Sequence, residues 1–323
     1  MREFLIGRED AGRKLDRWLQ KAAPGLTAGL MQKYFRQKDI KVNGKPAKRE
    51  TVLSEGDAVR AYIPDELFAP VRREDPLLSR FRWRLDIVYE DENVLLVDKR
   101  PGVMVHPDAT EKVNTLVTHV QAYLYQKGEY DSRAGRAFAP VPVNRIDRFT
   151  AGIVIFAKTE AAMRVLNQKI RDREIDKRYL CLTVGAPRPE SGRLEGYLQK
   201  NTKRVTVLDR PAPGTQKAIT NYRTIAVRDG IALVECALVT GRTHQIRAQF
   251  AHARHPLLGD GQYGDAARNR RYGLQQQALC AYRLVFAFQS DAGVLNYLKD
   301  RAFSVKQVPF LGAFFPEIDP DVI

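Results

Sequence analysis

The sequence has few cysteines, no long apolar run and a shortage of acidic residues. Its three cysteines, Cys181, Cys236 and Cys280, lie far apart in separate apolar segments, which argues against a disulfide framework and against a Cys-x-x-Cys zinc site. No segment approaches the roughly 20 consecutive apolar residues that span a bilayer. Residues 1–8 become charged too early for a signal peptide. We therefore expect a cytoplasmic protein with buried thiols and no membrane segment.

The shortage of acidic side chains leaves a strongly basic chain. There are 53 Lys and Arg against 38 Asp and Glu, so the formal net charge is +15 at pH 7. Such an excess favours a polyanionic partner, because binding releases condensed counterions. Nucleic acid is the first candidate, and a basic enzyme without a polyanionic partner is the alternative. A length of 323 residues is compatible with one large domain or with two domains.

The positive charge is concentrated near the N-terminus. Residues 13–49 contain 11 Lys or Arg but only two Asp. Apolar residues recur at helical spacing in residues 15–19, and again in residues 30–35 after Thr27, a residue type that caps helices. A short strand then leads into the Asn-Gly turn at Asn43. The pattern predicts two basic helices followed by short strands.

This order of elements resembles a small RNA-binding module named after the ribosomal small-subunit protein S-four. Gly-Arg-Lys-Leu-Asp at residues 12–16, Val-Asn-Gly at 42–44 and Gly-Asp at 56–57 carry the resemblance. It implies that the helix pair grips RNA backbone, and the alternative is a solvated basic hairpin of helices. The candidate RNA contacts are Arg13, Lys14, Arg17, Lys33, Arg36 and Lys41.

The rest of the chain predicts an α+β domain. Residues 64–78 carry prolines and charges without periodicity, as a linker does. The expected elements beyond it are a hairpin at 87–97, a helix at 116–124, a strand at 153–157, a helix at 159–171 and strands at 179–184, 204–209, 217–226 and 231–240. The last strands follow one another without long helices, so a mixed, largely antiparallel sheet is expected.

One carboxylate lies between two arginines in a polar loop. Asp147 is flanked by Arg145 and Arg148, and an apolar strand follows from Ile153. Neighbouring cations favour the ionised form of a carboxylate, which a nucleophile or base requires. A structural salt bridge gives the same local pattern, and on spacing alone it is the stronger interpretation.

Residues 144–152, Asn-Arg-Ile-Asp-Arg-Phe-Thr-Ala-Gly, resemble the His-Arg-Leu-Asp-Arg-x-Thr-Ser-Gly signature of the RluA-type pseudouridine synthases. Three further segments resemble family motifs in the same order. They are Lys-Arg-Pro-Gly-Val-Met-Val-His at 99–106, Lys-Arg-Tyr-Leu at 177–180, and Gly-Arg-Thr-His-Gln-Ile-Arg at 241–247 with Gly-Asp at 259–260 and Tyr-Gly at 263–264. The resemblance covers residues 86–290 and belongs to the ribosomal large-subunit branch.

The resemblance implies an enzyme that isomerises uridine in RNA without a cofactor or metal. Asp147 would be the nucleophile, adding to uracil carbon 6, capturing the sugar at carbon 1′, or supporting elimination to a glycal. Arg247 would pair with Asp147, Tyr179 would stack on the base and act as a general base, and Arg145 would fill the gap left by the flipped uridine. Further substrate contacts would be Asn144, Arg148, Thr150, Arg242, His244, Gln245, Lys99 and His106.

The sequence also departs from the family pattern and leaves alternatives. Asn144 stands where the common signature has His, so the loop around the flipped base carries an altered side chain. The alternatives are a non-catalytic RNA-binding or ribosome-assembly factor, a synthase for transfer RNA, and a carboxylate-dependent nucleoside hydrolase. The hydrolase would need a second acid, and the Gly-Asp turn at Asp260 favours a loop-fixing role. The histidines match no metal-ligand spacing.

We therefore predict an N-terminal S-four-like α/β RNA-binding domain over residues 1–64, a linker over 65–80 and a pseudouridine synthase domain over 81–323. The expected partner is RNA, either 23S-type ribosomal RNA or an assembly intermediate that contains it. We expect the chain to act as a monomer.

Overall fold

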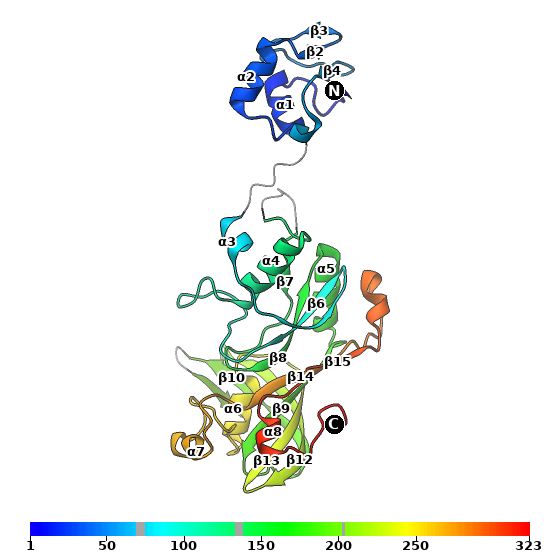
Figure 1. The fold of residues 1–323 in the computed structure, drawn as a ribbon. Coiled ribbons are helices and arrows are strands. Elements are labelled where there is room, and N and C mark those ends of the chain that lie inside the picture. The colour runs from blue at the N-terminus through cyan, green and yellow to red at the C-terminus, as the bar shows by residue number, and fades with distance from the viewer. Residues whose placement is uncertain (69–74, 133–137, 202–203) are drawn as a thin grey trace. The chain divides into compact units, whose positions relative to one another are not determined.

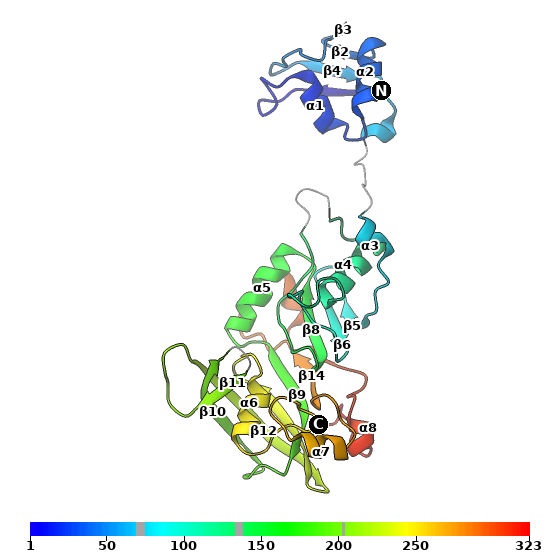
Figure 2. The same ribbon diagram turned by 90° about the vertical axis from the view of Figure 1, so that its left-hand side faces the viewer.

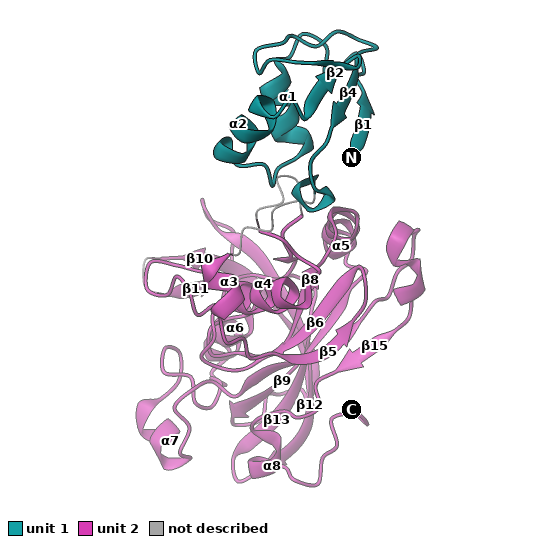
Figure 3. Cartoon of the chain, turned by 45° about the horizontal axis from the view of Figure 1, so that its top comes forward, with its two compact units in different colours: residues 1–74 teal, residues 75–323 magenta. Residues whose placement is uncertain are grey.

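The computed structural model describes residues 1–68, 75–132, 138–201 and 204–323. The chain forms two compact units, Met1–Glu74 and Asp75–Ile323 (Figure 3). The expected linker at 65–80 contains a 3-10 helix, Asp65–Phe68, and helix α3, Pro76–Arg80; its residues 69–74 lie outside the described ones. Helix α3 forms because a proline at its first position needs no backbone N–H partner, while the Asp75 side chain accepts from the next free N–H groups.

The first unit packs two helices on a small sheet. Its strands β1 (Arg2–Leu5), β2 (Ile40–Val42), β3 (Lys45–Pro46) and β4 (Ala58–Ala61) are ordered β1-β4-β2-β3. Helices α1 (Leu15–Ala22) and α2 (Ala28–Arg36) confirm the expected pair, and the Thr27 hydroxyl caps α2 by accepting from Leu30 N. Leu15, Trp18 and Leu19 are buried together, so the apolar stripe of α1 faces the core.

The second unit is built on an 11-stranded sheet (Figures 1 and 2). The main strand order is β11-β10-β12-β13-β9-β14-β8-β6-β5, with β15 beside β14 and β7 beside β8. The strands are β5 (Asp86–Glu90), β6 (Val94–Lys99), β7 (Val141–Pro142), β8 (Ala151–Ala157), β9 (Asp176–Val184), β10 (Ser191–Lys200), β11 (Val205–Leu208), β12 (Gln216–Arg228), β13 (Ile231–Leu238), β14 (Leu279–Val285) and β15 (Ala302–Ser304). Of these pairs only β14 with β8 is parallel, so the expected mixed, largely antiparallel α+β fold is confirmed.

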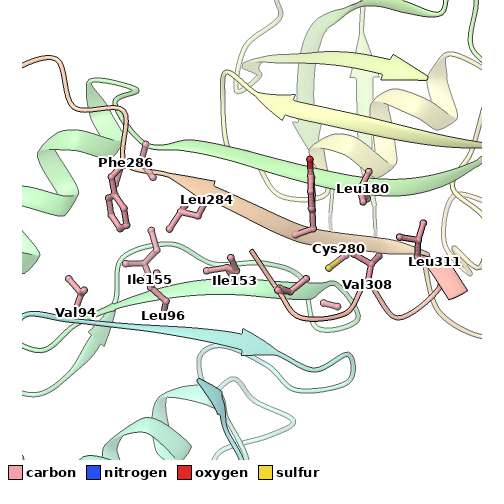
Figure 4. Packing of buried hydrophobic residues seen from close by; sticks show 14 of the residues in the cluster. Val94, Leu96, Ile153, Ile155, Leu180, Cys280, Leu284, Phe286, Val308 and Leu311 are labelled. Carbon is pink, nitrogen blue, oxygen red and sulfur yellow. The ribbon is translucent and has the colours of Figure 1, made fainter. Parts of the chain in front are cut away.

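Helices and coil cover both faces of this sheet. The helices are α4 (Leu116–Lys127), α5 (Glu160–Arg171), α6 (Gln245–His252), α7 (Ala266–Arg271) and α8 (Leu311–Phe314), with a second 3-10 helix at Gly293–Leu298. Ile153 and Ile155 of β8 pack in one core with α5 and the C-terminal segment (Figure 4), whereas Val154 and Phe156 pack in another with α4 and α6. Burial on both faces explains why β8 is apolar throughout, since its side chains alternate between the two cores.

The sequence did not predict two of the long strands. Strand β10 lies near one edge of the sheet, and β14 lies near its centre between β8 and β9. All three cysteines are buried and free, and the Cys181 and Cys236 sulfurs lie 3.9 Å apart. Across the described ranges, no helix combines the length and apolar character needed to cross a membrane.

Candidate active site

A cavity of about 280 Å³ opens beside the loop that connects β7 to β8. Asp147 comes from this loop, Tyr179 from β9, and His244 and Arg247 from the start of α6. The structure therefore brings together in one cavity three of the four motifs that resemble the synthase family.

Asp147 is held by an arginine that also binds a second, buried carboxylate. Arg247 Nη1 donates to Asp147 Oδ2 over 3.0 Å, while Nε and Nη2 donate to the two oxygens of Asp260 over 2.7 and 3.1 Å. Asp260 is completely buried and also accepts from the backbone N–H groups of Gln262 and Tyr263. These contacts use the planar fork of arginine, which lysine cannot reproduce, and they direct the Asp147 carboxylate at the cavity.

Tyr179 forms part of the cavity wall and is 6% exposed. Burial, with a further contribution from the negative charge of Asp147, raises the pKa of Tyr179 well above its usual value. Its hydroxyl therefore keeps its proton at neutral pH. Its ring faces the cavity as a protonated phenol, and both expected roles, stacking on the base and general base, stay predictions.

Lys99 ties the loop that carries Asp147 to the preceding family motif. Its ammonium donates to the carbonyl oxygens of Arg100, Val103 and Arg148 over 2.9 to 3.0 Å. Burial lowers the pKa of Lys99 to about 7, and the charge of Asp147 opposes that shift. Arg148 adds two contacts, because its Nε donates to Gly102 O and its carbonyl accepts from Gly102 N. Lys99 and Arg148 thus fix the loop from within the protein.

Gly152 allows two strands to approach closely beside this loop. Its φ is +111°, a backbone conformation that residues other than glycine rarely adopt. An added Cβ would lie only 2.6 Å from the backbone nitrogen and the carbonyl carbon of Ala281. Ala281 belongs to β14 and pairs with Gly152 in the parallel register. The glycine of the Asp-Arg-x-Thr-x-Gly pattern is thus required by the packing of β14 on β8.

Residues 93–252 match the family model described as RNA pseudouridylate synthase. An RNA pseudouridine synthase of Mycoplasma genitalium is 31% identical to this chain over 290 residues, which cover 88% of both chains. The ribosomal large subunit pseudouridine synthase D of Xylella fastidiosa is 30% identical over 92% of this chain and 85% of its own.

The chain belongs to the RNA pseudouridine synthases. The solved structure of human RNA pseudouridylate synthase domain containing 4 covers 69% of this chain and 89% of its own, with a TM-score of 0.54 and 20% identity. That likeness confirms the synthase fold. The family membership also confirms that the chain is an enzyme acting on RNA.

Other expected substrate contacts of this synthase have side chains that bind the protein itself. Asn144 Oδ1 accepts from Ile155 N over 2.8 Å, and its Nδ2 lies 3.5 Å from Ile153 O, so the side chain extends the pairing of β8. The Thr150 hydroxyl accepts from Gln277 Nε2 over 3.3 Å. Asn144 therefore secures the base of the loop, and its amide has a structural use where the common signature has His.

Gln245 has a similar structural use at the start of α6. Its side chain is buried, donates to Ile219 O and to the Thr220 hydroxyl, and accepts from Arg242 N and the Thr240 hydroxyl. The loop before α6 is thereby fixed to β12. The Arg242 side chain is exposed at the cavity mouth, where it remains a candidate RNA contact.

Arg145 and His106 stay accessible at the surface of the synthase unit. Arg145 lines the cavity and has no ion-pair partner among the described residues. Partial burial lowers the pKa of His106, and the positive charge of Arg145 lowers it further. A neutral histidine beside a free guanidinium leaves the arginine charge available to a polyanion.

In the first unit, the expected RNA contacts differ in how far their charge is compensated. Arg13 lies 3.4 Å from Asp10, and the Lys41 ammonium lies over the Tyr62 ring. No acidic group within the described ranges pairs with the other four, which are exposed: Lys14, Arg17, Lys33 and Arg36.

The roles of two residues at the site were not predicted from the sequence. Tyr263 contacts His244 through its hydroxyl, and Gln277 contacts Thr150. Tyr263 lies in the Tyr-Gly motif at residues 263–264, which marked the residue as part of the family pattern but did not indicate its contact with His244. Gln277 precedes β14, and only the unpredicted position of that strand brings it to the loop.

Proposed function

We propose that this synthase isomerises specific uridines in large-subunit ribosomal RNA, or in an assembly intermediate containing it, with Asp147 as the nucleophile. The observation that carries the proposal is the Asp147 carboxylate, which Arg247 orients toward the cavity. The ribosomal substrate is supported by the Xylella fastidiosa relative, which is named as a ribosomal large-subunit enzyme. A cytoplasmic location is the expectation that goes with such a substrate.

The reaction requires the target uridine to leave the RNA stack. The reacting atoms of a stacked uridine are inaccessible, so the nucleotide must turn into a pocket. The cavity beside Asp147 supplies such a pocket, and Tyr179 in its wall provides an aromatic face for the base. Arg145, which lines the same cavity, would occupy the space that the flipped nucleotide leaves.

Asp147 then attacks the flipped nucleotide or assists its cleavage. The carboxylate adds to uracil carbon 6, captures the sugar at carbon 1′, or supports elimination to a glycal. All three routes need a carboxylate that is fixed before the substrate arrives. The hydrogen bond from Arg247, itself locked by Asp260, provides this preorganisation.

The first unit would supply affinity and the second unit chemistry. The exposed basic residues of α1 and α2 match the charge of RNA phosphates. The resemblance to the S-four module supports the same division, with RNA backbone as the ligand of these helices.

The test is pseudouridine mapping by carbodiimide labelling and reverse transcription. Unmodified ribosomal and transfer RNA would each be treated with the wild type, Asp147→Ala or Asp147→Asn. We expect new stops in large-subunit RNA with the wild type and none with either variant. Stops confined to transfer RNA would reassign the substrate, and stops that persist with both variants would refute the nucleophile. No stops in any RNA would favour the non-catalytic binder.

A further inference from the structure

His244 lies at the cavity beside the nucleophile, in a backbone conformation that fixes its direction. It occupies the N-cap position of α6 with φ +54° and ψ 21°, and its side chain makes no capping hydrogen bond. This is a left-handed conformation in which histidine is enriched. Its Nε2 lies 3.8 Å from Asp147 Oδ2, beyond hydrogen-bond range. Nε2 therefore faces the space next to the carboxylate without being bound by it.

The other ring nitrogen of His244, Nδ1, contacts the hydroxyl of Tyr263, and this nitrogen is the acceptor for the hydroxyl proton. His244 Nδ1 and the Tyr263 hydroxyl are 3.0 Å apart, and the same hydroxyl accepts from Val205 N over 2.9 Å. Tyr263 is 7% exposed. A buried hydroxyl that accepted from both neighbours would leave its own proton without an acceptor, which is costly. Tyr263 therefore donates to Nδ1.

Donation from Tyr263 places the histidine proton on Nε2. A neutral imidazole carries one proton, so an Nδ1 that accepts leaves Nε2 as the donor. The opposite tautomer would point the Nε2 lone pair at the Asp147 carboxylate, 3.8 Å away. Repulsion between the lone pair and the carboxylate is a second reason against that tautomer. Burial raises the pKa of Tyr263 and lowers that of His244, and Arg247 lowers the latter further. Both shifts agree with a protonated phenol and a neutral imidazole.

The charged groups around His244 leave this neutral state in place. Asp147 and Asp260 favour the imidazolium, whereas Arg247 and Lys200 oppose it, and burial opposes it most. The Tyr263 ring also lies against Arg247, whose guanidinium carbon is 5.1 Å from the ring centroid. The arginine that orients the nucleophile thus also packs on the tyrosine that sets the histidine tautomer.

We propose that His244, as the neutral Nε2–H tautomer set by Tyr263, donates a hydrogen bond to a carbonyl oxygen of the target uracil and stabilises negative charge there. This rests on the proposed reaction at Asp147. Addition to carbon 6 converts the ring into an enolate, with charge on a carbonyl oxygen. Cleavage of the bond from carbon 1′ to nitrogen 1 leaves its electron pair on the base, whose charge spreads over the carbonyl oxygens. In all three routes a hydrogen-bond donor to this carbonyl oxygen stabilises the charge. His244 supplies that hydrogen bond and keeps its own proton.

The kinetic test separates the position of the donor from the structural role of the residue. Single-turnover tritium release would be measured on large-subunit ribosomal RNA transcribed with 5-tritiated uridine. His244→Gln places an amide N–H near the position of Nε2, whereas His244→Asn places it near Nδ1 and tolerates the left-handed backbone. We expect His244→Ala and His244→Asn to react about 10² to 10³-fold more slowly, and His244→Gln to regain at least tenfold. RNA affinity should change less than threefold in all three.

The tautomer is tested on the protein alone, by nitrogen and carbon NMR of histidine-labelled full-length chain at pH 7.5. We expect the Nε2–H form in the wild type, and a mixture of tautomers in Tyr263→Phe. An Nδ1–H form or an imidazolium in the wild type would overturn the inference, as would His244→Ala that reacts within threefold of wild type. Wild type that releases no tritium from any RNA would overturn the proposed function and the donor role together, and the spectrum would still report the tautomer.

Discussion

Arg247 Nη1 donates to Asp147 Oδ2 over 3.0 Å, although 100 residues separate the two in the sequence. The other two guanidinium nitrogens bind Asp260, so the position of the proposed nucleophile depends on a fully buried carboxylate. Replacement by lysine would keep the charge and lose the fork.

We expect Arg247→Lys to lower the single-turnover rate at least 100-fold and to destabilise the chain by about 2 to 4 kcal/mol, because the buried Asp260 would lose paired donors. Tritium release and urea unfolding would measure the two effects. Arg193→Lys is the matched control, since Arg193 is exposed and pairs with Glu195 at the surface. An unchanged rate in Arg247→Lys would show that a point charge is enough.

Asp147→Asn should abolish turnover while leaving RNA affinity and stability near wild type. The amide preserves shape and removes the nucleophilic oxygen, so a loss of at least about 10⁴-fold is expected, as with removal of other catalytic nucleophiles. Filter binding, thermal unfolding and tritium release would be compared. Asp209→Asn, which alters an exposed carboxylate that contacts His252, should retain full activity.

Gly152→Ala should destabilise the synthase unit by more than about 3 kcal/mol, because the added methyl group meets the β14 backbone and the positive φ is unfavourable. Gly312→Ala is the control, since the same methyl group there meets nothing within 4 Å. Urea unfolding of both variants gives the comparison. A stable Gly152→Ala protein would mean that β14 can move away from β8 at little cost.

Asp98→Asn should stabilise the chain in a pH-dependent way. Burial, with the negative charge of Asp86, raises the pKa of Asp98 to about 6. Between about pH 4 and 6 the folded state then holds a proton that the unfolded state has released, so this carboxyl weakens folding as pH rises. Asparagine removes that effect. We expect a gain of about 1 to 2 kcal/mol at pH 7.5, because partial exposure to solvent screens the carboxylate, and almost none at pH 4. Urea unfolding measures both, and an equal gain at both pH values would contradict the raised pKa.

Arg17→Ser with Arg36→Ser should weaken RNA binding and flatten its salt dependence. Each lost phosphate contact lowers the slope of log K against log salt by roughly 0.7 to 0.9. Arg2→Ser with Arg60→Ser is the matched control, because these arginines already pair with Asp65 and Glu3. Fluorescence anisotropy at several salt concentrations would decide. If log K falls with log salt equally steeply in both double variants, helices α1 and α2 are not the RNA contact.

Local patterns predicted the elements that depend on local chemistry. The periodicity of residues 116–124 and 159–171 and the turn between β5 and β6 all have counterparts in the structure. Strand β14 was missed although its residues are apolar, because its place between β8 and β9 is set by pairing with segments far away in the chain. Short apolar runs carry no signal of their partners.

At the site, too, the motifs could be recognised in the sequence, whereas their tertiary contacts could not. The motifs containing Asp147, Tyr179 and Arg247 were recognisable as a set by resemblance, and spacing alone could not have placed them in one cavity. The side chains of Asn144, Gln245 and Lys99 face backbone groups of the protein. Whether a polar side chain in a motif faces substrate or backbone depends on tertiary neighbours that one sequence does not display.

The place of β14 also sets an order of events during synthesis. The segments carrying Asp147 and Tyr179 leave the ribosome well before residues 279–285, yet β14 must enter between β8 and β9 to join them. In the sheet, β14 is the strand that joins β8 and its neighbours to β9 and its neighbours. A translation product that stops before residue 279 would therefore lack the strand that joins the two parts of the sheet carrying Asp147 and Tyr179.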